Sequence, residues 1–209
     1  MDWTFEKKIN TKKELREIMG HPNEIVTRKT IDYIDENCKS FIEKSPFITI
    51  ATSDSNRNFD VSPKGDPAGF VKILNDKTLA IPDRPGNKKA DTLTNIIQNP
   101  NIGLIFFIPG IRETLRVNGE AKIVRDEKVL ELLSHKGKPP LFAIIVNVKE
   151  AFMHCAKCII RSKLWDKVEE TKERTVPTLA KTLVDHGKLD ISVSELDDKI
   201  KDDEKTNLY

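Results

Sequence analysis

Hydrophobic residues change their spacing about a quarter of the way along the chain. Thr11 and Glu14 have the spacing of a capping box, in which two side chains satisfy free amides at the start of a helix. A second helix is predicted from about Thr27 to Glu43, because apolar residues recur there at steps of three and four: Ile31, Ile34, Cys38, Phe41 and Ile42. The N-terminal part is therefore expected to be helical.

From Phe47 onward, short β-branched and aromatic runs alternate with clusters of Asp, Asn, Gly and Pro, which is typical of strands joined by turns. The runs are FITIATS, NFDVSPK, FVKIL, TLAIP, NIGLIFFIP, TLRVNGEAKIV and LFAIIVNVKEAFMH, with a hairpin loop at 75–77 and short helices at 90–98 and 126–134. The regular strand–helix alternation of a parallel sheet is absent. We therefore expect a mainly β fold with helices (α+β), in which a mostly antiparallel sheet closes into a barrel.

Three parts follow from these elements. Residues 1–45 form an N-terminal helical segment, residues 46–166 the barrel domain, and residues 167–209 a C-terminal helical tail. The highly charged stretch at 197–205 is expected to be a solvated helix face or a frayed end.

The composition argues against several classes of protein. The 209 residues include 35 basic and 33 acidic side chains, and this near-neutral balance argues against a nucleic-acid-binding protein. Three cysteines, an odd number, fit a reducing compartment better than a secreted disulfide scaffold. With no run of roughly 20 apolar residues and no secretory signal pattern, we expect a cytoplasmic protein without a membrane partner.

The strongest local signal for chemistry is IPDRPGNKKADTLTNI, residues 81–96. Asn87 is predicted to cap a helix beginning near Lys88, so that free amides would point at an anion beside Arg84, Lys88 and Lys89. This combination favours a phosphate site. The alternative is that the two adjacent lysines only keep an exposed helix soluble.

Two further segments are candidates. In DVSPKGDPAGF (60–70), a strand with Ser62 and Lys64 runs into a loop at Gly65, which could offer amides and a cation to a planar heterocycle, or be an ordinary hairpin loop. In HCAKCIIRSKLW (154–165), a helix would place Lys157, Arg161 and Trp165 together, or simply present a basic face with an anchoring Trp. Its C-x-x-C pair has too few companions for a zinc site.

These segments, together with ETLRVNGEAKI (113–123), resemble the pyridoxamine 5′-phosphate oxidase-like (PPOX-type) flavoproteins over about residues 25–166. The resemblance implies a split β-barrel homodimer with FMN bound at each subunit interface. It assigns the FMN phosphate to Asn87, Lys88 and Lys89. It places the flavin ring along the strand from Val61 to Asp66, near Pro82 and Asp83, and near Thr114, and it brings His154, Lys157, Arg161 and Trp165 close, from the partner subunit.

The same resemblance implies an FMN-dependent oxidoreductase acting on a small molecule. True pyridoxamine phosphate oxidases carry a C-terminal Arg-Leu-x-Pro run, which the tail here lacks, so we expect a different substrate. No catalytic residue is assigned. The alternative function is a binding or storage module of the same fold that holds a flavin, a deazaflavin or haem without turnover.

Overall fold

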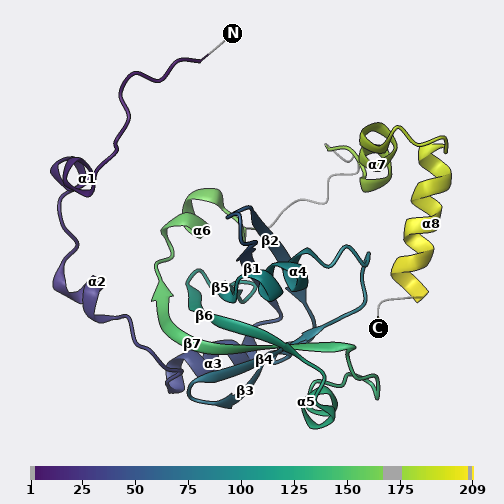
Figure 1. Cartoon of the computed structure of the whole chain (residues 1–209), viewed down its shortest axis with the longest axis horizontal. Helices are drawn as coiled ribbons and strands as arrows, with labels where there is room; N and C mark the ends of the chain where they lie inside the picture. The colour runs from purple at the N-terminus through teal and green to yellow at the C-terminus, as the bar shows by residue number, and fades with distance from the viewer. Residues whose placement is uncertain (1–2, 167–175, 207–208) are drawn as a thin grey trace.

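Seven antiparallel strands form one sheet in the computed structural model, which describes residues 3–166, 176–206 and 209 (Figure 1). The sheet order is β2-β1-β5-β6-β7-β4-β3. The strands are β1 (Phe47–Ser53), β2 (Phe59–Gly65), β3 (Lys72–Asn75), β4 (Thr78–Asp83), β5 (Asn101–Phe107), β6 (Thr114–Val124) and β7 (Phe142–His154). The helices are α1 (Lys12–Met19), α2 (Glu24–Arg28), α3 (Glu36–Lys44), α4 (Asp91–Gln98), α5 (Glu127–Leu132), α6 (Lys157–Ser162), α7 (Leu179–Gly187) and α8 (Val193–Thr206).

The sheet curls around a single apolar core. Alternate residues of β1, such as Ile48 and Ile50, are fully buried, and they belong to the same cluster as Leu79 and Ile81 near the other end of the sheet. A flat sheet would not bring these strands to one cluster. The predicted antiparallel α+β fold is therefore confirmed. Within the described residues the backbone ladder leaves β2 and β3 as edges, so barrel closure stays a prediction.

The N-terminal helices follow the sequence prediction in part. The capping box of α1 is present, with the Glu14 amide donating to Thr11 Oγ1 at 3.2 Å and the Thr11 amide donating to the Glu14 carboxylate at 3.2 Å. The single helix predicted from Thr27 to Glu43 is wrong. The chain is interrupted between α2 and α3, because Ile31 pairs with Ala151 of β7 and Asp35 starts a new helix by accepting from the Cys38 amide.

Helix α3 packs into the core, although the sequence places it in the N-terminal segment. Phe41 and Ile42 are buried, and so is Cys38, whose burial raises the pKa of the thiol to about 12. The helical period that misled the prediction thus comes from real core contacts. The tail contains the expected helices, α7 and α8, which pack together over the buried Ala180, and the charged stretch at 197–205 lies in α8.

No helix in the described part of the chain is both long and apolar enough to span a membrane.

Gly119 marks the one position where β6 and β7 slip in register, and there the two backbones nearly touch. A Cβ built on Gly119 would lie 2.2 Å from the carbonyl oxygen of Asn147.

We expect Gly119→Ala to lower the free energy of unfolding by about 1–3 kcal/mol, as in other overpacked sites. Gly65→Ala is the control, since its Cβ meets only ordinary contacts at 3.5 Å or more, and it should stay within about 0.5 kcal/mol of the parent in chemical denaturation. Equal stability of Gly119→Ala and the parent would contradict the close approach.

Candidate functional site

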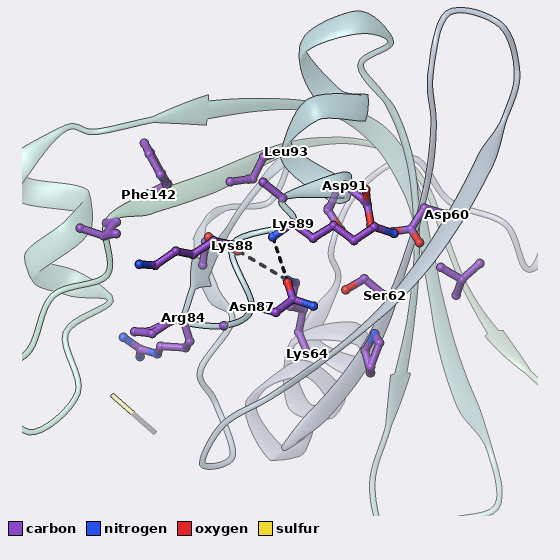
Figure 2. Close-up of a pocket in the computed structure, with 18 residues that line it drawn as sticks. Asp60, Ser62, Lys64, Arg84, Asn87, Lys88, Lys89, Asp91, Leu93 and Phe142 are labelled. Atoms are coloured by element: carbon purple, nitrogen blue, oxygen red, sulfur yellow. Dashed lines mark hydrogen bonds and ion pairs between the residues drawn. The ribbon is translucent and has the colours of Figure 1, made fainter. Parts of the chain in front are cut away.

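A cavity of about 530 Å³ opens between β2, the end of β4 and the loop that leads into α4 (Figure 2). Residues 60–64 of β2 form one wall and residues 83–93 another, while Leu141 and Phe142 at the start of β7 add an apolar side. The strands β2 and β4 lie toward opposite ends of the sheet order, so the cavity sits where the curled sheet brings its two ends together.

The alternation of β2 explains which of its side chains serve the cavity. Asp60, Ser62 and Lys64 are half-buried, whereas Phe59 and Val61, which alternate with them, are exposed; Val61 still borders the cavity. As an edge strand, β2 tolerates Pro63, which has no amide hydrogen to donate to a ladder. Its polar residues are therefore held by a rigid strand while its free edge stays accessible.

Two ion pairs connect the end of β2 with the end of β4. Lys64 Nζ lies 3.5 Å from Asp83 Oδ1, and Arg84 Nε lies 2.6 Å from Asp66 Oδ2. The Asp66 side chain is only 1% exposed, and its second oxygen accepts from the Tyr209 hydroxyl at 2.8 Å, which raises the pKa of that phenol. Arg84 also donates to the carbonyl of Leu133 at 2.9 Å, so two of its nitrogens anchor the start of the loop.

The loop itself corrects the predicted helix start. Helix α4 begins at Asp91, not near Lys88, and its N-cap is Ala90 without a side-chain cap. The side-chain oxygen Oδ1 of Asn87 instead accepts from the Lys89 backbone amide at 3.0 Å, which closes a tight turn before the helix. Lys88 and Ala90 both take the left-handed conformation, with φ of 62° and 59°. Such turns point successive amides into a concavity that suits an anion.

The charges around the cavity favour an anionic ligand. Its lining contains four basic side chains, those of Lys64, Arg84, Lys88 and Lys89, against the three carboxylates of Asp60, Asp83 and Asp91. Lys89 pairs with Asp91 at 2.8 Å, and this contact raises the pKa of the lysine. Among the described residues, the ammonium of Lys88 has no ion-pair partner. A phosphate could therefore meet Lys88 without first displacing a carboxylate.

Eight of the residues singled out from the sequence line this cavity: Val61, Ser62, Lys64, Asp83, Arg84, Asn87, Lys88 and Lys89. Gly65 and Pro82 lie next to lining residues on β2 and β4 but do not line it themselves. The remaining predicted residues are Thr114, His154, Lys157, Arg161 and Trp165, and they do not line it either.

That second group gathers at the far end of β6 and β7. Thr114 is buried and pairs with His154 in the ladder. The indole of Trp165 donates to the Ile111 carbonyl at 2.8 Å, so the segment after β7 is bound to the loop between β5 and β6. Lys157 and Arg161 are exposed on α6, and within the described residues neither has an ion-pair partner.

Sequence reasoning missed the apolar wall. Phe142 stands opposite Asp83 in the β4–β7 pairing, and Leu141 precedes it, although 59 positions separate Asp83 and Phe142 in the chain. Only the strand register could have joined them. Tyr209 was missed for the same reason, because its contacts with Asp66 and Arg84 are long-range. Asp66 was expected at the end of the strand along the flavin ring, but its pairing with Arg84 was not predicted.

The cysteine pair shows no sign of a metal. Cys155 and Cys158 are exposed, with free thiols. Nowhere in residues 3–166, 176–206 or 209 do three or more His, Cys, Asp or Glu side chains gather to hold an ion.

The family model for pyridoxamine 5′-phosphate oxidase matches residues 34–155, more than half of the chain. The chain belongs to this family. No curated protein matches it. Solved structures similar to this member of the pyridoxamine 5′-phosphate oxidase family include HupZ from Group A Streptococcus, which is 21% identical, with a TM-score of 0.49 and coverage of 57% of this chain and 93% of that one.

Two others are more distant. General stress protein 26 from Bacillus anthracis is 14% identical, with a TM-score of 0.43 and coverage of 55% of this chain and 88% of that one. An FMN-binding protein from Syntrophomonas wolfei is 14% identical, with a TM-score of 0.41 and coverage of 68% of this chain and 93% of that one.

Proposed function

We propose that this chain binds FMN in the cavity between β2, β4 and α4 and works as an FMN-dependent oxidoreductase on a small molecule. The observation that carries the proposal is a cavity with a basic turn at one end and an edge strand along its side, in a chain of the pyridoxamine 5′-phosphate oxidase family. A phosphate at the turn would leave the planar ring system beside β2.

The residues present fit such a cofactor. The volume of about 530 Å³ falls within the range of roughly 300–1,000 Å³ typical of ligand pockets. The turn at 87–90 supplies Lys88 and Lys89 for a phosphate dianion. The apolar side at Leu141 and Phe142 suits an aromatic ring better than a second charged group.

When bound, FMN would supply the electron-carrying chemistry, and the protein would supply position and electrostatics. Lys88 and Lys89 would hold the phosphate, while Ser62 and Lys64 on β2 would face the ring edge. Lys64 already pairs with Asp83, so its charge is partly balanced before any ligand arrives. Leu141 and Phe142 would exclude water from one side of the cavity. Catalytic residues stay unassigned.

We further propose that a second copy of the chain completes the site. Lys157 and Arg161 are exposed cations for which the described residues offer no ion-pair partner, and an anionic flavin on the other subunit would give them a counter-charge. His154 and Thr114 lie beside them and Trp165 fixes the segment. In a homodimer this group would approach the partner's cavity. The missing Arg-Leu-x-Pro run favours a substrate other than pyridoxamine phosphate.

The visible spectrum of the purified full chain, before and after addition of FMN, tests the function. We expect the absorption bands of oxidised flavin, and their bleaching by reduced nicotinamide or another physiological donor, with recovery in air. Bound flavin that no donor reduces would indicate a storage or binding module, and a Soret band would indicate haem. A colourless protein that takes up no FMN would overturn the proposal.

Lys88 offers a test of the phosphate position. Lys88→Ala and Lys88→Gly should both raise the FMN dissociation constant about 10- to 100-fold, since each loses a charge-assisted hydrogen bond. Lys88→Gly should also be more stable than Lys88→Ala by about 1 kcal/mol, because glycine takes a φ of 62° without strain. Lys122→Ala, on an exposed part of β6, is the control for lost charge. Parent-like FMN affinity in both Lys88 variants would place the phosphate elsewhere.

Arg161 tests the shared site. If the cation reaches the partner's flavin, FMN binding and dimerisation favour each other by the same free energy. Arg161→Ala should then weaken FMN binding, and it should weaken the dimer more with FMN than without it. Light scattering over a dilution series measures the dimer dissociation constant with and without FMN. The ratio of the two constants gives the linked change in FMN affinity. A monomer that binds FMN with undiminished affinity at the lowest concentrations would rule out the shared site.

A further inference from the structure

Residues 3–28, here called the N-terminal arm, expose an unusual amount of apolar surface. Trp3, Phe5, Ile18, Met19 and Ile25 are each at least 70% exposed, and neither α1 nor α2 buries a residue. The arm leads away from the sheet (Figure 1). Among the described residues, the hydrogen bonds and ion pairs of residues 3–28 join the arm only to itself. A monomer would leave this surface in water.

Helix α1 has the shape of a docking element. Leu15, Ile18 and Met19 lie three and four residues apart, so they share one face, while Lys13 and Glu17 pair on another. The capping box fixes where the helix starts. Eight residues are too few for a helix to be stable in water by itself, since isolated helices shorter than about 12–15 residues are marginal. Packing of the apolar face would supply the missing stability.

The arm is fastened where it leaves the sheet. Ile31 and Ala151 exchange two backbone hydrogen bonds, of 3.0 and 2.7 Å. Lys29 donates to the Met153 carbonyl at 2.9 Å and lies over the Phe152 ring. The arm therefore departs next to the β7 end that carries His154. Its 26 residues, helical in part, reach on the order of 50 Å, enough to cross to a neighbouring barrel.

The same molecule has an apolar surface without a cover. On the outer side of β1, β2 and β5, Phe47 packs against Phe107 with 6.0 Å between ring centroids, and Phe59 and Val61 continue the surface along β2. On β1, Phe47 precedes the inward-facing Ile48, and on β2 Phe59 and Val61 alternate with the half-buried Asp60 and Ser62. Phe59 is 79% and Val61 62% exposed. We call Phe47, Phe59, Val61 and Phe107 the outer face.

We infer that the N-terminal arm docks on the outer face of a second copy of this chain. In a two-fold dimer each arm covers the other copy's face, so both exposed surfaces are buried by one exchange. Aromatic side chains bury roughly 150–250 Å² each, so Trp3 and Phe5 alone would supply close to half of the ~800 Å² per partner that a standard interface needs. This inference rests on the homodimer proposed above.

The test uses the full chain with Ile18→Gln and Met19→Gln combined, and Glu17→Gln as the matched control on the other side of α1. Sedimentation over a dilution series gives the dimer dissociation constant, and hydrogen exchange of residues 12–19 is followed at the same concentrations. We expect the double variant to raise the dissociation constant at least about 100-fold, since a two-fold dimer loses four apolar contacts. In the parent, the amides of α1 should be protected from hydrogen exchange only at concentrations at which the dimer forms. Glu17→Gln should behave like the parent in both measurements.

Cross-linking of lysines in a mixture of light and isotope-labelled chains, combined as monomers and then concentrated, identifies the docking partner. We expect about half of the arm-to-barrel links to join a light chain with a heavy one. Links confined to one isotope would show that each arm folds onto its own barrel and would overturn the inference. So would a parent-like dimer in the double variant, or protection of α1 that requires anionic vesicles. A parent that stays monomeric at every concentration, with or without FMN, would overturn the proposed homodimer itself.

Discussion

Two ion pairs join the ends of a sheet that its backbone ladder leaves apart. The sheet order puts β2 at one edge and β4 next to the other, yet Lys64 meets Asp83 and Asp66 meets Arg84 across the gap. Both pairs are partly buried, and the Lys64 and Asp83 side chains are 23% and 20% exposed. Such pairs add little net stability, because desolvation offsets much of the attraction, but removing the partner of the more buried Asp66 leaves an uncompensated charge at a cost of up to about 3–5 kcal/mol. Their effect is therefore to fix geometry: the cavity exists because these two ends are held at one separation.

The Asp66–Arg84 pair also determines the shape of the basic turn. Arg84 is tied to Asp66 and to the Leu133 carbonyl, so the chain enters the turn from a fixed point. At the other end, Asp91 begins α4 and holds Lys89. Between these two fixed points, Lys88 and Ala90 adopt the left-handed backbone conformation, and each costs roughly 1–3 kcal/mol of folding free energy. Two strained residues persist only where their surroundings dictate them, which is typical of a ligand-binding turn.

The sequence predicts local features of this protein better than long-range ones. Strand β6 was expected at 114–124 and lies there, because its residues and the flanking turns specify it locally. The helix predicted over 27–43 is broken by a contact with Ala151, more than 100 positions away, which no local pattern reports. In the site, Ser62, Lys64 and the basic turn were found from their segments. Phe142 and the true start of α4 were not, since they depend on strand register and on the strained turn.

Strand β2 connects the two proposals made for this chain. Successive residues of a strand point to opposite faces, so Asp60, Ser62 and Lys64 share the half-buried face at the cavity, while Phe59 and Val61 belong to the exposed face and Val61 only borders the cavity. A slip of one residue would exchange the two sets, placing apolar side chains at the cavity and charges on the outer face. An edge strand with an apolar outer side is also prone to unwanted pairing unless something covers it. Cover from a second copy would protect that edge and would fix the register that presents Ser62 and Lys64 to the proposed flavin. The proposed cofactor site and the proposed interface would thus both follow from one alternating strand.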